Sequence, residues 1–295
     1  MTPRIKGILL MVASMVIFTL LDAAAKHLVQ TLPPAVAVFG RYLVAFVLSV
    51  LVIMRKGGPQ LMVTRHPALQ ALRGVMLMAA TMLNFIAIMY LQLAQTAAIF
   101  FTIPLWVCAL SVPILGEHVG LRRWIAVAVG FMGVLVIMRP GSDSFHWAML
   151  LSIASSFCGS IYNIVTRKVG GRDRAETSLF YVGLVGALAG TIPLPFVWQT
   201  PQGLQWLLLG FIGLVGTIGH FMLIQAHRLA PASVLAPFMY TQIVWMILVG
   251  YVFFGDVPDL WTLVGAAIVV ASGLFVFAGE AREQRVDLRE MHETK

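Results

Sequence analysis

The sequence carries little charge. Asp, Glu, Lys and Arg together make up 11% of its 295 residues, against about 25% in soluble domains. Hydrophobic residues make up 60%, and the mean hydropathy is +0.91. A water-soluble globule cannot cover its surface with so few charges. A soluble enzyme and a nucleic-acid-binding domain are therefore excluded, although the net charge is +8, and the composition indicates an integral membrane protein.

Cysteine is scarce as well. Cys108 and Cys158 are the only two, and both lie inside apolar runs, so the sequence has no disulfide framework and no metal-ligand spacing. The HExxH and GxSxG motifs of hydrolases are missing, and so is a pair of deep carboxylates. We therefore expect no enzymatic activity, no metal and no cofactor.

Long apolar runs fill most of the chain. A helix that spans a bilayer needs about 20 mainly apolar residues. Breaking the sequence at charges and at Pro and Gly clusters predicts ten such helices, near residues 6–28, 34–54, 70–92, 95–115, 121–138, 146–167, 176–198, 203–227, 231–254 and 260–279. The segment 280–295 is too polar to insert, and we expect a frayed, charged cytoplasmic tail there.

The sequence repeats itself once. Residues 7–28 align without gaps with 148–169, and 72–94 align with 208–230; Gly116-Glu117 corresponds to Gly255-Asp256. Since the first helix has this later partner, we expect it to be retained rather than cleaved as a signal peptide. The repeat predicts two five-helix units, 1–140 and 141–279. Because five is odd, the second unit must enter the bilayer inverted, as in many transporters.

Basic residues predict the orientation. If both termini are cytoplasmic, all of the 20 Lys and Arg residues except Lys26, Arg41 and Arg139 lie on the cytoplasmic side, as the positive-inside rule requires. We therefore expect a multi-pass protein of a bacterial-type inner membrane, a monomer in the lipid bilayer.

Ten helices, an inverted repeat and a Gly-Glu pair closing the fourth helix together resemble the drug/metabolite transporter superfamily, in its EamA branch. Within it, the sequence is most similar to exporters of aromatic and other neutral amino acids of the YddG type. The resemblance covers about 6–279 and rests on Lys26, Arg41, Pro104, Gly116-Glu117 and the Gly130/Gly133 pattern. It departs in the second copy, where Tyr240 stands in place of Pro104 and Asp256 in place of the glutamate. The resemblance implies a central cavity formed mainly by helices 3, 4, 8 and 9.

Polar and aromatic residues at mid-helix are candidates for that cavity. Asn84 and His220 are equivalent by the repeat, each near a threonine, Thr81 or Thr217, and Trp106 is equivalent to Gln242. Such residues also serve as hydrogen-bonding contacts between helices, worth about 0.6 kcal/mol each. The candidate substrate-binding residues carry no obvious fixed charge, which favours a neutral zwitterion, with aromatic faces for an apolar side chain: Asn84, Tyr90, Trp106, His220, Tyr240, Gln242 and Trp245.

Asp22 and Lys26 lie four residues apart on one helix face, so they can pair, with Lys26 reaching the outer interface. Alternatively, Asp22 is a proton-coupling group. Arg41 either balances the charge of Asp22 or donates a hydrogen bond to a neighbouring backbone carbonyl. Pro104 and Pro237 each remove a backbone hydrogen bond and are candidate hinges. The sequence thus predicts an exporter of neutral amino acids that works by alternating access. The alternative is a proton-coupled exporter of lipophilic cations that uses Asp22.

Overall fold

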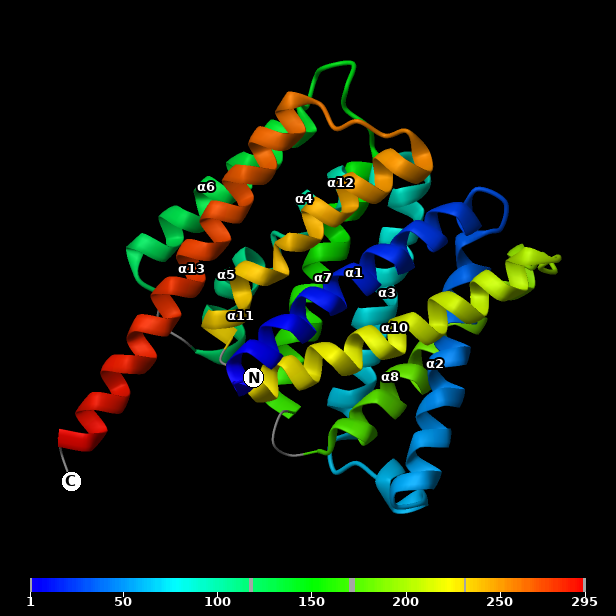
Figure 1. Ribbon diagram of the computed structural model, residues 1–295, viewed down its shortest axis with the longest axis horizontal. Helices are drawn as coiled ribbons and strands as arrows, with labels where there is room; N and C mark the ends of the chain where they lie inside the picture. The colour runs from blue at the N-terminus through cyan, green and yellow to red at the C-terminus, as the bar shows by residue number, and fades with distance from the viewer. Residues whose placement is uncertain (1, 117–118, 170–172, 231, 294–295) are drawn as a thin grey trace.

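The computed structural model describes residues 2–116, 119–169, 173–230 and 232–293, and all the regular structure within them is helical (Figure 1). The elements are α1 (Pro3–Val29), α2 (Pro34–Lys56), the short 3-10 helix η1 (Pro59–Met62), α3 (Pro67–Tyr90), α4 (Leu93–Phe100), α5 (Ile103–Leu115), α6 (Leu121–Met138), α7 (Ala148–Val169), α8 (Ala175–Thr191), α9 (Leu194–Val197), α10 (Leu204–Leu229), α11 (Ala232–Met239), α12 (Thr241–Phe254) and α13 (Leu260–Glu293).

Eight helical segments of the described chain are long and apolar enough to cross a bilayer. They are Pro3–Val29, Pro34–Lys56, Pro67–Tyr90, Leu93–Ile114, Leu121–Met138, Ala148–Thr166, Leu204–Leu229 and Pro237–Phe254. The other two predicted spans fall on α8, which has 17 residues, and on α13, whose apolar part is Leu260–Val276. The number of ten spans therefore stays a prediction.

The expectation of a frayed tail was wrong for the backbone, because α13 continues past Gly279 to Glu293. The added segment is rich in Glu and Arg and also contains Ala, Gln, Leu and Met, all of which are strong helix formers. Its polarity keeps it out of lipid but does not unwind it.

The predicted fourth and ninth helices are each interrupted at mid-length. α4 gives way to α5 just before Pro104, and α11 gives way to α12 shortly after Pro237. Both helices then end at a glycine in the left-handed region, Gly116 with φ 71° and Gly255 with φ 68°, where a side chain would be strained. Glu117, the partner of Gly116 in the sequence motif, lies outside the described residues.

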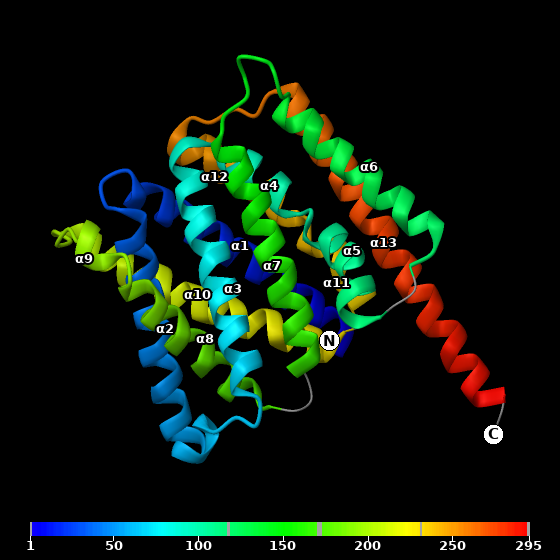
Figure 2. The same cartoon turned by 180° about the vertical axis from the view of Figure 1, so that it is seen from behind.

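Packing joins the two halves of the chain more than it joins neighbours in sequence. The most extensive helix pairs are α1 with α10, α6 with α13, α3 with α7 and α2 with α8. In both views α6 and α13 lie side by side along one edge of the molecule (Figures 1 and 2). Each pair takes one helix from residues 1–140 and one from residues 141–279, so neither half encloses a core of its own.

Corresponding helices of the two halves run antiparallel where they touch. On α6 and α13, Gly130 lies against Ser272 while Ile137 lies against Gly265. On α2 and α8, Phe46 meets Gly183 and Phe39 meets Gly190. In both pairs the residue numbers rise on one helix as they fall on the other. The glycines allow these backbones to approach closely, as in other membrane helix pairs.

Two glycines of α10 provide a test of this packing. A Cβ built on Gly213 would collide with Val44 of α2, whereas a Cβ on Gly210 meets nothing within 4 Å. We predict that Gly213→Ala lowers the thermal unfolding midpoint in detergent, since overpacking costs about 1–3 kcal/mol. Gly210→Ala should leave the midpoint unchanged or raise it, because alanine favours helix. Equal shifts in the two variants would contradict the observed packing.

Candidate functional site

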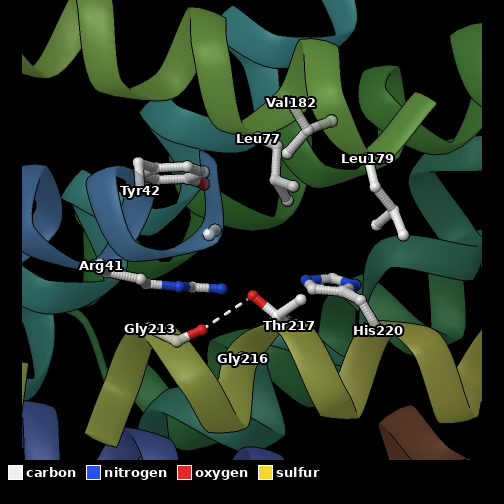
Figure 3. A pocket seen from close by; sticks show the side chains of 10 residues that line it. Arg41, Tyr42, Leu77, Leu179, Val182, Gly213, Gly216, Thr217 and His220 are labelled. Atoms are coloured by element: carbon white, nitrogen blue, oxygen red, sulfur yellow. Dashed lines mark hydrogen bonds between the residues drawn. The ribbon is translucent and has the colours of Figure 1, made fainter. Parts of the chain in front are cut away.

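A small internal cavity of about 30 Å³ lies between α2, α3, α8 and α10 (Figure 3). The Arg41 guanidinium and the His220 ring lie on either side of Thr217, whose hydroxyl donates to the Gly213 carbonyl at 2.9 Å. The remaining lining residues are Tyr42, Ala45, Leu77, Leu179, Val182, Gly213 and Gly216. A volume of this size holds a water molecule but no metabolite.

Arg41 gives this interior a fixed charge. Its Nη1 donates to Thr81 Oγ1 at 3.2 Å, and the Tyr42 hydroxyl lies 2.8 Å from the same oxygen. The guanidinium also lies 5.8 Å from the centre of the Phe85 ring. A Cβ on Gly216 would lie 3.4 Å from Nε, so the missing side chain leaves room for the arginine. The sequence predicted substrate-binding residues without a fixed charge, whereas this small cavity is lined by Arg41; the predicted set itself stays a prediction.

Asp22 is an acidic residue close enough to Arg41 for the two side chains to interact electrostatically. Its Oδ1 accepts a hydrogen bond from Asn84 Nδ2 at 3.2 Å, and it attracts Arg41 electrostatically. The three residues come from α1, α2 and α3, whose apolar contacts hold the side chains together. The hydrogen bond of Arg41 goes to the Thr81 hydroxyl, and the role of Arg41 towards Asp22 stays a prediction.

Lys26 is paired elsewhere, so the predicted Asp22–Lys26 pair was wrong. Lys26 Nζ donates to Asp256 Oδ2 at 2.7 Å and to the Leu91 carbonyl at 3.0 Å, and it lies 4.8 Å from the centre of the Phe254 ring. The residue is buried within the protein, with 7% of its surface exposed. A pair along one helix gains only about 0.2–0.5 kcal/mol, whereas a buried ammonium needs several acceptors.

Further contacts tie residues 256–259 to the first half of the chain. Arg139 makes an ion pair with Asp259, and Gln92 Nε2 donates to the Val257 carbonyl at 3.3 Å. Partial burial opposes ionisation of Asp259, but hydrogen bonds from Thr262 and the charge of Arg139 outweigh it and lower the pKa of its carboxyl group. Residues 256–259 are thereby held against Gln92 at the start of α4 and Arg139 at the end of α6.

Tyr90 and Trp106 do not join Asn84 and His220. Tyr90, at the end of α3, is 49% exposed and stacks on His146 with ring centres 5.3 Å apart. Trp106 Nε1 donates to Ser156 Oγ at 3.1 Å, and its ring packs edge-on against Phe131. Tyr90 therefore lies at the exposed end of α3, and Trp106 lies in the contact between α5 and α7.

The candidates around α12 lie in a third place. Tyr240 is buried against Gly273 and Phe101, and its hydroxyl has no hydrogen-bond partner. The indole Nε1 of Trp245 is also buried without a partner, beside the apolar cluster that α1 shares with α10 and α11. Gln242 is half-buried on the same helix. Buried donors without partners are rare in proteins, so the role that the sequence predicts for both residues stays a prediction with two unused donors beside it.

Comparison with known proteins assigns the family. The model of the EamA-like transporter family matches the chain twice, over residues 5–139 and 146–278. The chain belongs to the EamA-like transporter family. A protein of known crystal structure shares this fold, with a TM-score of 0.66 and 17% identity over 95% of this chain and 99% of its own.

Curated relatives of this EamA-like transporter carry several names. The riboflavin transporter of Rhizobium johnstonii is 29% identical and covers 95% of this chain and 93% of its own. The S-adenosylmethionine uptake transporter of Rickettsia prowazekii is 26% identical, covering 94% of each. The pseudopaline exporter CntI of Pseudomonas aeruginosa is 28% identical, covering 90% of this chain and 94% of its own. The predicted likeness to amino acid exporters of the YddG type is not confirmed by these relatives.

Sequence reasoning missed Tyr42 as a partner of Thr81 and Asp256 as the partner of Lys26. Tyr42 adjoins Arg41, but one residue along a helix turns the side chain by about 100°, so adjacency gave no reason to group them. Asp256 did carry a signal, because both it and Lys26 end predicted spans on the same side of the bilayer.

The Lys26–Asp256 pair makes a testable prediction for stability. Asp256→Ala leaves a buried ammonium without its carboxylate, and breaking a buried pair in this way costs about 3–5 kcal/mol. We expect a large fall in the thermal midpoint measured in detergent. In the double variant Lys26→Met with Asp256→Leu, most of the loss should be recovered. A midpoint in Asp256→Ala equal to the parent's would contradict the pair.

Proposed function

We propose that this EamA-like transporter carries a small zwitterionic metabolite of the amino acid type across the inner membrane by alternating access. Export of neutral amino acids, aromatic ones included, is the form of this activity predicted from the sequence. The observation that carries the proposal is the Arg41 guanidinium inside the helix bundle, beside a cavity and balanced by Asp22.

A buried arginine suits the carboxylate end of such a substrate. Charged groups in the bilayer centre are costly and usually functional. A guanidinium binds a carboxylate through two parallel hydrogen bonds. Arg41 uses one nitrogen for Thr81, which leaves other N–H groups for a ligand. When the bundle opens, a substrate carboxylate replaces water beside Arg41 without removing Asp22.

The antiparallel pairs α2/α8 and α6/α13 support an inverted repeat, and so does the double match to the family model. We therefore propose ten spanning helices in two units, 1–140 and 141–279, followed by the tail 280–295. Rocking of the halves around their shared site would expose it to each side in turn. The interruptions beside Pro104 and Pro237 would serve as hinges.

The Lys26–Asp256 pair would act as a gate in this cycle. From the distribution of basic residues we propose that both termini are cytoplasmic. In that orientation Lys26, Leu91 and Asp256 would lie at the outer end of the bundle. Their hydrogen bonds join α1, α3 and α12, so the outer end is closed in this state. Release of Lys26 from Asp256 would open it.

The remaining candidates would contact the rest of the substrate. Asn84 and His220 lie around Arg41, and the unpaired donors of Tyr240 and Trp245, with Gln242 beside them, would face an aromatic or polar side chain once the bundle opens. Trp106 would pack at the edge of this space, and Tyr90 would meet substrate at the outer rim.

The names of the relatives suggest candidate substrates that can be compared with the site. S-adenosylmethionine carries an amino acid group as well as a fused heteroaromatic ring, and Arg41 would hold its carboxylate. Riboflavin has such a ring but no carboxylate, so it is the competing substrate. A lipophilic cation that uses Asp22 is the alternative predicted from the sequence. The positive charge of Arg41 beside Asp22 disfavours it, since a second cation would be repelled.

Substitution of Arg41 tests the proposed substrate class. We expect Arg41→Gln to raise the KM for labelled L-tryptophan and S-adenosylmethionine at least tenfold in proteoliposomes, because a hydrogen bond to a charged group is worth about 1.5–3 kcal/mol. Transport of L-tryptophanamide, which lacks the carboxylate, should change little. Arg174→Gln is the control, since Arg174 is exposed. Robust riboflavin transport unaffected by Arg41→Gln would support the competing substrate instead.

Asp22→Asn separates the proposal from the cation exporter. Loss of the carboxylate leaves Arg41 uncompensated, so the thermal midpoint should fall. L-tryptophan should then stabilise the variant at least as much as the parent, because its carboxylate restores the balance. A cation exporter would behave differently: tetraphenylphosphonium would stabilise the parent, and that effect would vanish in Asp22→Asn. The measurement is thermal unfolding in detergent with each compound.

A further inference from the structure

One face of α3 carries three polar residues and one leucine. Arg73, Leu77, Thr81 and Asn84 follow one another at intervals of four, four and three residues, which places them on the same side of a helix. Asn84 holds Asp22, Thr81 holds Arg41, and Leu77 lines the cavity. Arg73 continues this face towards the basic end of the bundle, about 12 Å from Thr81 along the axis at 1.5 Å per residue.

Arg73 is buried but incompletely bonded. Only 4% of its surface is exposed. Its Nη2 donates to the Ser178 carbonyl at 2.5 Å, and the guanidinium lies 5.6 Å from the centre of the Tyr162 ring. Its Nε is buried and has no hydrogen-bond partner. An arginine whose role is to join α3 to α8 would satisfy this group as well, because an unpaired buried donor lowers stability.

Arg73 and Arg41 face a common interior. His220 of α10 experiences the charge of both arginines, and these arginines come from α2 and α3, two helices that contact each other. Each also has a carboxylate as a counter-charge: Asp22 attracts Arg41, and Asp173 attracts Arg73.

Asp173 is kept ionised for this role. Partial burial opposes its ionisation, but hydrogen bonds from Thr64 at 2.5 Å and Gln70 at 2.7 Å outweigh it and lower the pKa of its carboxyl group. Gln70 itself is fully buried, and its Oε1 has no hydrogen-bond partner. Arg73 and Gln70 therefore offer one open donor and one open acceptor at the same end of α3.

We propose that Arg73 is a second carboxylate-binding station, on the side of the bundle that we assign to the cytoplasm. A substrate carboxylate would occupy Arg73 on that side and Arg41 at mid-membrane, with the inward face of α3 as the path between them. The inference rests on the proposed function, because it needs a substrate with a carboxylate. It adds a site that determines affinity on one face of the membrane.

The test measures the KM for labelled L-tryptophan separately on each face of proteoliposomes with one protein orientation. We expect Arg73→Gln to raise the KM about tenfold on the cytoplasmic face and to leave the opposite KM within twofold. Arg41→Gln should raise both. With L-tryptophanamide as the probe, the effect of Arg73→Gln should disappear. Arg174→Gln, which removes an exposed charge on the same side, should change neither KM.

The outcomes separate this inference from the proposed function. If Arg41→Gln raises the KM but Arg73→Gln leaves it unchanged or raises it equally on both faces, Arg73 is structural and the second station is overturned alone. If the parent transports no carboxylate-bearing probe, both proposals fail. Should Arg73→Gln fail to fold, Arg73→Lys replaces it. Lysine keeps the charge but loses the planar fork, so a rise in the cytoplasmic KM alone still supports the station, and unchanged values overturn it.

Discussion

A guanidinium inside a membrane bundle must be compensated, and much of this structure serves that requirement. Arg41 has a carboxylate from α1, a hydroxyl from α3 and a glycine-lined gap on α10. No single helix supplies these groups, and α10 belongs to the other half of the chain. The charge therefore links the two halves at the point where they meet. Purely apolar contacts between helices would not fix their relative position in this way, because lipid tails can replace such contacts at little cost.

The sequence predicted much of the fold, because apolar length and the internal repeat are properties of composition and spacing. Most helices begin and end within a few residues of the expected positions, although α8 ends at Thr191 and α13 continues to Glu293, and Gly116 and Gly255 form equivalent ends. The site was harder to predict. Lys26 had a possible partner four residues away, yet it pairs with Asp256, 230 residues along the chain. Helical spacing shows which residues share a face, but only packing shows what that face meets. Arg41 was recognised as a residue within a helix, and its place beside the cavity depended on the missing side chains of Gly213 and Gly216.

The family likeness constrains architecture more than substrate. Relatives of similar identity are named for riboflavin, S-adenosylmethionine and pseudopaline, so the shared helices are compatible with cargoes of different size and charge. The features that would distinguish them lie on inward faces, where one side chain changes the chemistry without changing the packing of the bundle. Arg41 and the open donors of Tyr240 and Trp245 are features of this kind.

The length of α13 has a practical consequence. Its 34 residues extend for about 51 Å at 1.5 Å per residue, whereas the hydrocarbon core is about 30 Å thick. In the ten-span arrangement that we propose, roughly 20 Å of continuous helix would project beyond the lipid, at the C-terminal end that extends past the other helices in Figure 1. A fluorophore or fused reporter attached there would be held clear of the headgroups by a semi-rigid arm. Its distance to a second label would then follow the tilt of α13 during the transport cycle.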